Sequence, residues 1–217
     1  MLVVCWSVKG GVGVTATAAT LAVVGVSGAP EPVIIVDLTG DVPACLGVDP
    51  PVGPGVAEWL AAGQDTPPDA LGRLHHPVAD GLELVPRGTG PLSVDRVGLL
   101  VQVLMSTGRT VVVDAGRADR CPVARRLATE ADRSLLITRL CAIGIGRALR
   151  LPARPTGVVM LRERGRLLGP ADIERSTGSA VVADLAVDPA VARAMDVGLL
   201  HARLPRSVRS TMAAVLR

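Results

Sequence analysis

The start of the chain constrains its fold more than any other segment. An apolar run over residues 2–7 leads directly into a glycine-rich turn, and a helical pattern over 13–26 follows. Glycine suits a turn in which backbone N–H groups converge on an anion, because a Cβ would obstruct the turn. The N-terminus of the helix adds its dipole at the same place. This order of strand, turn and helix predicts a phosphate-binding loop over Val8-Lys9-Gly10-Gly11-Val12-Gly13-Val14-Thr15, in which Thr15 is placed to bind a phosphate-bound Mg²⁺.

Lys9 stands out because it is the single lysine among 23 basic residues, the other 22 being arginine. The chain also has no Phe or Tyr, and such a bias is typical of a GC-rich genome that has lost lysine codons. A lysine retained only inside the glycine turn indicates a chemical role at that position. The net charge of +3 is too small to predict nucleic-acid binding by itself.

Short apolar runs alternate with helical patterns along the rest of the sequence. The runs are continuously apolar, as is typical of parallel strands covered on both faces. Their alternation with helices predicts an α/β fold: a doubly wound, mainly parallel sheet of about seven strands with helices on both faces. Together with the phosphate-binding turn, this sheet is of the P-loop NTPase type. We expect strands over residues 2–7, 33–38, 82–86, 110–115, 134–140, 155–161 and 181–187.

The spacing between these runs predicts the helices and the domain organisation. No linker is long enough to separate two domains, so a single domain over residues 1–217 is predicted. No apolar stretch reaches the roughly 18 residues of a membrane-spanning helix, and the start lacks a secretory signal, so a cytoplasmic protein is predicted. The four scattered cysteines predict neither a zinc site nor disulfides. Helices are expected over residues 13–26, 56–62, 91–107, 119–130, 170–176, 189–197 and 205–216.

The glycine turn resembles the deviant Walker A motif of the ParA/MinD family of ATPases, K-G-G-x-G-K-[ST]-[ST]. In that family the lysine matched by Lys9 reaches across a sandwich dimer to the partner's nucleotide. Two positions depart from the motif: Val14 stands in place of the lysine that contacts the β- and γ-phosphates, and Ala16 in place of the final Ser or Thr. The resemblance implies that ATP or ADP with Mg²⁺ is bound by Lys9, Gly10, Gly11, Val12, Gly13, Val14, Thr15 and Ala16.

Three later segments extend the resemblance. The run VIIVDLTGD over 33–41 is similar to the family's V-D-x-D strand; Asp37 matches its first carboxylate, Thr39 replaces the second, and Asp41 is a candidate substitute. The run TVVVDAG over 110–116 resembles a Walker B strand, with Asp114 holding the metal through water. Residues 181–198 resemble the segment that closes over the base in MinD-like proteins. The resemblance therefore implies Lys9, Asp37 and Asp41 as catalytic residues, and Thr15, Asp37 and Asp114 at the metal.

The two replaced positions predict a slow enzyme. Val14 removes a positive charge beside the γ-phosphate, and losing one preorganised contact of this kind raises a barrier by roughly 3–4 kcal/mol. With Thr39 also replacing a carboxylate, hydrolysis slower by on the order of a hundredfold than in an intact relative is predicted, while nucleotide binding is expected to survive. If the nucleotide binds between two subunits, formation of a homodimer would depend on the nucleotide concentration. Whether the chain hydrolyses ATP at all stays open.

The biological role is implied by resemblance alone. In lacking the second lysine, the chain resembles proteins of the CpaE/TadZ branch, which help to position Tad-type pilus machinery at a cell pole. The arginine-rich composition resembles that of actinobacterial septum-site-determining relatives. The resemblance therefore implies a dimeric switch or scaffold with a protein partner in a pilus or secretion machine or in a division machine, recruited to a pole or division site.

Two other functions stay open. A nucleotide-free pseudo-ATPase could keep the fold as an interaction module. A chromosome- or plasmid-partitioning ATPase would bind DNA through arginine clusters, although each cluster is more simply a solvated face. The amphipathic end over 205–216 has no aromatic anchor, so we expect it to pack on the domain rather than bind membrane. The clustered arginines are Arg117, Arg120, Arg125, Arg126, Arg162, Arg164, Arg166, Arg203, Arg206 and Arg209.

Overall fold

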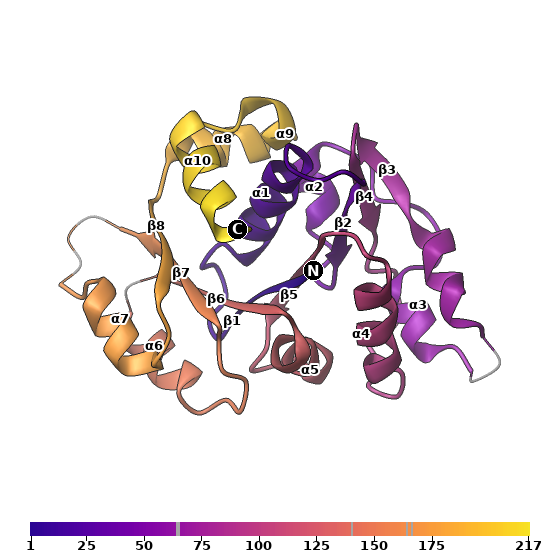
Figure 1. Cartoon of the computed structure of the whole chain (residues 1–217), viewed down its shortest axis with the longest axis horizontal. Helices are drawn as coiled ribbons and strands as arrows, with labels where there is room; N and C mark the ends of the chain where they lie inside the picture. The colour runs from indigo at the N-terminus through magenta and orange to yellow at the C-terminus, as the bar shows by residue number, and fades with distance from the viewer. Residues whose placement is uncertain (64–65, 140, 164, 166) are drawn as a thin grey trace.

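Eight strands form one sheet in the computed structural model, which describes residues 1–63, 66–139, 141–163, 165 and 167–217 (Figure 1). The strand order is β3-β4-β2-β5-β1-β6-β7-β8, and all neighbours run parallel except β3 and β4. The predicted doubly wound, mainly parallel α/β sheet is therefore confirmed. The strands are β1 (Leu2–Ser7), β2 (Val33–Asp37), β3 (His76–Ala79), β4 (Leu82–Val85), β5 (Val111–Arg117), β6 (Arg133–Arg139), β7 (Gly157–Arg162) and β8 (Val181–Ala186).

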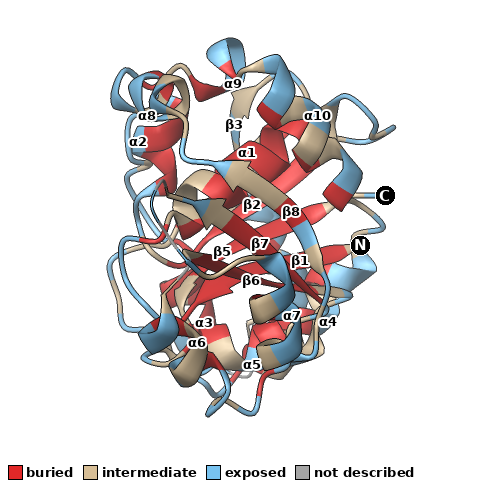
Figure 2. Ribbon diagram, turned by 90° about the vertical axis from the view of Figure 1, so that its left-hand side faces the viewer, coloured by how far each residue is buried: buried red, intermediate tan, exposed pale blue. Residues whose placement is uncertain are grey.

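The central strands are buried along their length. Every residue of β1 and β2 is buried, and so are the first five of β5. Alternate side chains of β1 enter two different apolar cores: Leu2, Val4 and Trp6 enter one, while Val3 and Cys5 enter the other. Figure 2 shows the buried residues running through the sheet and into α1. Burial on both faces is why these strands are continuously apolar in sequence.

Helices cover both faces of the sheet (Figure 1). The two cores lie between the sheet and each helical layer. On one face lie α1 (Val14–Val26), α2 (Val42–Leu46), α8 (Pro189–Asp196), α9 (Leu200–Arg203) and α10 (Arg206–Val215). On the other lie α3 (Val56–Ala61), the 3₁₀ helix η1 (Pro68–Leu74), α4 (Val97–Ser106), α5 (Pro122–Glu130), α6 (Ala142–Ala148) and α7 (Pro170–Thr177).

The expected strand number of about seven is one too low. The missed strand, β3, has the sequence HPVA and pairs antiparallel with β4 at the edge of the sheet. A proline is tolerated in such an edge strand, but it removes the sequence signal of a buried strand. Leu140, at the expected end of the strand over 134–140, lies outside the described residues, as do Arg164 and Arg166.

Several helix boundaries also differ from expectation. Four short elements, α2, η1, α6 and α9, were missed, and none exceeds seven residues. The helix expected from residue 119 begins at Pro122, because proline suits the first turn and Asp119 instead pairs with Arg117. The helix expected from residue 91 begins at Val97, directly after Arg96, whose guanidinium donates to the carbonyls of Trp59 and Thr66 at 3.0 and 2.8 Å.

The final helix packs on the domain. Val208, Met212 and Val215 of α10 are buried and contact the core that contains α1. This agrees with the expectation that the apolar side of the segment is used internally. Within the part of the chain that the structure describes, no helix combines the length and the apolar character that a membrane crossing requires.

Candidate functional site

The glycine turn lies between the buried strand β1 and the N-terminus of α1. Gly11 and Gly13 have φ angles of 70° and 99°, in the left-handed region that favours glycine. A Cβ at Gly13 would also lie 2.7 Å from Cδ1 of Leu161 on β7. Position 13 therefore requires glycine for two reasons: its backbone conformation and its close contact with the neighbouring strand.

The turn presents a series of unused hydrogen-bond donors. None of the backbone N–H groups from Gly10 to Ala16 donates a hydrogen bond to a residue that the structure describes. Gly10 and Gly11 are exposed, and no atom lies within 4 Å of the position of a Cβ at Gly11. Free N–H groups at a helix N-terminus attract an anion. The residues present thus fit a phosphate group.

The two positively charged positions of the Walker motif differ in this chain. Val14 is buried in the apolar core beside α1, with 8% of its surface exposed, so position 14 offers no charge to a ligand. Lys9 is exposed, and its Nζ lies 3.7 Å from Sγ of Cys141. The N–H of Gly144 contributes most to lowering the pKa of the Cys141 thiol, and the Lys9 ammonium contributes as well. The contact that Lys9 makes here is within its own chain, and its reach to a second subunit stays a prediction.

Asp37 and Asp114 lie side by side at the carboxyl ends of two strands. They are register partners on β2 and β5, and both are fully buried. Asp37 accepts hydrogen bonds from the N–H groups of Thr39, Gly40 and Val42 at 2.8, 2.8 and 3.1 Å, so the loop after β2 wraps around it. Asp37 therefore fixes the shape of the loop that would sense a phosphate.

Thr39 connects the two carboxylates. Its hydroxyl oxygen lies 3.0 Å from Oδ1 of Asp37 and 2.8 Å from Oδ2 of Asp114. Burial is the main cause that raises the pKa of Asp114 to about 6, and the charge of Asp37 raises it further, while hydrogen bonds from Thr15 and Thr39 lower it. Because a hydroxyl has one proton, Thr39 donates to only one carboxylate at a time, and protonation of Asp114 satisfies both contacts.

The residues expected at the metal are thus brought together, and Asp41 joins them through its backbone N–H, which donates to Oγ1 of Thr39 at 3.4 Å. Thr15 lies near enough to Asp114 for its hydroxyl to lower the pKa of that carboxyl group, and Asp114 is the register partner of Asp37. Asp41 is exposed at the start of α2, and its side chain does not cap that helix. Among the described residues, no three His, Cys, Asp or Glu side chains gather as a metal site. The hydroxyl of Thr15 and the carboxylate of Asp114 are the groups that would hold Mg²⁺ together with phosphate oxygens and water.

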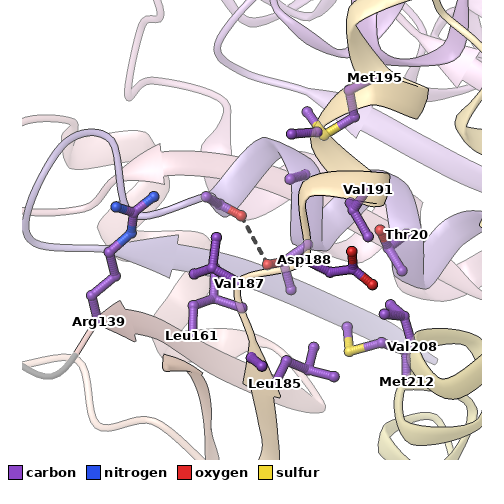
Figure 3. Close-up of a pocket in the computed structure, with 15 residues that line it drawn as sticks. Thr20, Arg139, Leu161, Leu185, Val187, Asp188, Val191, Met195, Val208 and Met212 are labelled. Atoms are coloured by element: carbon purple, nitrogen blue, oxygen red, sulfur yellow. Dashed lines mark hydrogen bonds between the residues drawn. The ribbon is translucent and has the colours of Figure 1, made fainter. Parts of the chain in front are cut away.

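A pocket of about 170 Å³ begins at Gly13 and extends toward α8 and α10 (Figure 3). Its wall is mostly apolar, which suits the flat ring of a base, and Arg139 is the basic side chain among the described residues that line it. Sequence reasoning pointed to the segment over 181–198 but missed the contributions of β6, β7 and α10. The described residues at its wall include Thr20, Arg139, Leu161, Leu185, Val187, Asp188, Val191, Met195, Val208 and Met212.

A backbone contact joins the two sides of this site. Gly47, at the end of α2, packs directly on Gly198, which follows α8; a Cβ at Gly47 would lie 2.2 Å from the carbonyl oxygen of Gly198. Both glycines have positive φ angles, 71° and 67°. The loop around Asp37 leads into α2, and α8 forms part of the pocket wall. The two halves of the site are therefore in contact without any side chain between them.

Sheet order and site geometry first define a class: an α/β domain whose β1–α1 turn, at the carboxyl edge of a doubly wound sheet, is shaped to hold an anion. No protein-family model and no curated protein sequence matches the chain. Solved structures do match it. A ParA family ATPase from Chlorobium tepidum TLS has a TM-score of 0.75 and 18% identity, covering 99% of this chain and 96% of that one.

Two MinD structures are similar as well. MinD from Aquifex aeolicus has a TM-score of 0.77 and 18% identity, over 100% of this chain and 95% of that one. The septum site-determining protein MinD from Pyrococcus horikoshii OT3, complexed with Mg-ADP, has a TM-score of 0.71 and 18% identity, over 98% and 93%. The chain therefore has the fold of ParA/MinD P-loop ATPases, as the resemblance implied.

Proposed function

We propose that this chain binds ATP or ADP with Mg²⁺ at the β1–α1 turn and acts as a positioning protein of the ParA/MinD kind. The observation that carries the proposal is the row of free N–H groups from Gly10 to Ala16, next to the Thr15–Asp114 pair. Free donors at a helix N-terminus suit phosphate, and the adjacent hydroxyl and carboxylate suit Mg²⁺. The Mg-ADP bound to a MinD of the same fold supports this assignment.

We further propose that hydrolysis is slow. Val14 is part of the apolar core and has no charged group, so position 14 cannot supply the positive charge that a lysine would place beside the γ-phosphate. Thr39 is held between two carboxylates and carries no charge with which to orient water. Asp41, the remaining candidate, is exposed, and the contact that it makes with Thr39 is through its backbone N–H, at 3.4 Å. A phosphate-release assay as fast as that of an intact ParA protein would contradict this proposal.

A slow cycle suits a switch that assembles with nucleotide and stays assembled. In this proposal the exposed Lys9 leaves Cys141 and reaches the nucleotide of a second subunit, so that dimerisation depends on ligand. The partner would be a protein of a pilus, secretion or division machine, and recruitment to a pole or division site would follow from that partner. This part of the proposal rests on the family resemblance.

One observation bears on the DNA-partitioning alternative. Several arginines of the expected clusters are engaged within the chain: Arg117 with Asp119, Arg126 with Glu130, and Arg162 with Asp184. Arginines that pair with their own carboxylates offer less charge to a phosphate backbone. The structure thus favours the positioning role that does not depend on DNA.

The decisive experiment is calorimetric titration of ATP and ADP with Mg²⁺, followed by size measurement with and without nucleotide. We expect saturable binding and a ligand-dependent shift from monomer to dimer. Binding without any change of size would limit the proposal to a monomeric nucleotide-binding protein. Absence of binding would favour the alternative of a nucleotide-free interaction module.

A further inference from the structure

Arg139 is the last residue of β6 and the one basic side chain among the described residues that line the pocket. Figure 3 shows it extending along the rim of the pocket beside Leu161. β6 and β7 are parallel, and Arg139 is in register with Leu161, so both side chains lie on the same face of the sheet. Leu161 in turn closes on Gly13. Arg139 and the glycine turn therefore both neighbour the side chain of Leu161.

The hydrogen bonding of Arg139 is incomplete. Its Nη1 donates to Oε1 of Glu163 at 2.7 Å. Its Nε is buried and donates to no residue that the structure describes. A buried donor without an acceptor is costly, and a guanidinium with its fixed fork of donors matches the oxygens of a phosphate. The unused Nε–H therefore indicates an acceptor that a ligand would supply.

Among the described residues, the other cationic positions of the turn and beside it are engaged elsewhere or have lost their charge. Position 14 is the buried Val14. Lys9 directs its ammonium to a thiol at the start of α6. Arg117, at the end of β5, lies beside the glycine turn, because a Cβ at Gly10 would be 3.9 Å from its Cδ. Its guanidinium donates to both carboxylate oxygens of Asp119, at 3.0 and 2.6 Å. Arg139 differs from these residues because it combines a position at the pocket with an unused donor.

We propose that Arg139 binds a phosphate group of the nucleotide and supplies the positive charge that Val14 cannot. The proposal rests on the proposed function, since it assigns a role within that same site. In the structure Glu163 holds one end of the guanidinium. A phosphate would compete with this carboxylate for Arg139, so Glu163 weakens nucleotide binding by the same contact that positions the arginine.

The test is calorimetric titration of ADP with Mg²⁺ into the wild-type chain and into variants. We expect Arg139→Gln to lower the affinity for ADP roughly 10-fold or more, because a charge-assisted hydrogen bond is lost. The salt dependence of binding should also become weaker. We expect Glu163→Gln to raise the affinity, because it removes the competing charge.

Arg162→Gln is the matched control. Arg162 follows Leu161 directly on β7, so its side chain lies on the opposite face of the sheet, where it pairs with Asp184 at 3.1 Å. This variant removes the same charge from the same edge of the sheet without touching the pocket. ADP affinity equal to that of the wild type is expected, and a loss as large as that of Arg139→Gln would overturn the proposal.

The remaining outcomes separate the proposal from the proposed function. If the wild type binds ADP and Arg139→Gln binds it equally well, the role of Arg139 is refuted while nucleotide binding stands. If the wild type binds neither ADP nor ATP, the proposed function fails and this inference fails with it. If Arg139→Gln does not fold, as judged by thermal unfolding, Glu163→Gln decides: increased ADP affinity supports the proposal, and unchanged affinity overturns it.

Discussion

Replacing Asp114 by Asn tests the electrostatics at the carboxyl ends of β2 and β5. Burial, with Asp37 adding to it, raises the pKa of Asp114 from 3.8 to about 6. The folded protein therefore holds this proton more tightly than the unfolded chain does. Asp114 thus contributes stability that is fully present below about pH 4 and is lost as the pH rises through about 6. The interval from 3.8 to about 6 corresponds to about 3 kcal/mol.

Urea unfolding of both proteins from about pH 4 to about pH 8 measures this contribution. Asn keeps the size of the side chain, can accept the N–H of Gly116 as Asp114 does at 3.2 Å, and carries no charge. We expect Asp114→Asn to match the wild type near pH 4 and to exceed its stability by up to about 3 kcal/mol near pH 8. A difference between the two proteins that does not change with pH would refute this reasoning.

Asp119→Asn provides the control of opposite sign. Burial alone would raise the pKa of Asp119, but the hydrogen bond and the charge of Arg117 lower it. Asp119 therefore contributes stability that is present at neutral pH and is lost as the pH falls through its folded pKa. We expect this variant to be less stable than the wild type near pH 8, where Asp114→Asn is more stable.

Three further changes test packing and hydrogen bonding. Gly13→Ala should abolish ADP binding and lower the Tm, because the new Cβ meets Leu161 at 2.7 Å in a left-handed turn; calorimetry and thermal unfolding measure both effects. Glu58→Gln should lower the free energy of unfolding by about 1–3 kcal/mol at neutral pH, because the N–H groups of Gly55, Thr89 and Gly90 donate to its carboxylate and lower its pKa to about 2. The wild-type contribution of Glu58 should then be lost in urea unfolding as the pH falls from about 4.5 toward 2. Gly198→Ala should cost about 3 kcal/mol, because its Cβ would lie 2.3 Å from a backbone atom of the facing glycine.

Gly28→Ala is the control for both glycine substitutions. No atom lies within 4 Å of the position of a Cβ at Gly28, and its φ angle is not positive. We expect its Tm and ADP affinity to stay near those of the wild type. Gly13→Ala with normal ADP affinity would show that the turn is not the binding site. Gly198→Ala with normal stability would show that the contact with Gly47 can relax.

Local sequence signals predicted the part of the site that is formed by consecutive residues. The glycine turn and the strand ends at Asp37 and Asp114 each follow a buried apolar run, and parallel strands bring such ends to one edge. The strand-helix alternation predicted the sheet for the same reason. These features depend on residues that are neighbours in sequence, so a short stretch of sequence is enough to predict them.

The pocket depends on residues that only the folded chain brings together. Arg139 and Leu161 are 22 positions apart and meet because β6 and β7 pair in register. One arginine among 22 carries no signal of its own. Strand β3 and the short helices were missed because a few residues with a proline or without periodicity resemble loops. The free Nε–H of Arg139 is a property of three-dimensional packing and has no counterpart in the sequence.

The junction between Gly47 and Gly198 determines how a displacement would spread through this protein. Most packed surfaces absorb a small shift by rotating side chains, but here main chain lies on main chain and no rotamer is available. Any rearrangement that moves α2 must therefore carry the end of α8 with it or separate the two segments. Opening and closing of the two walls would be mechanically linked, without a relay of intervening residues.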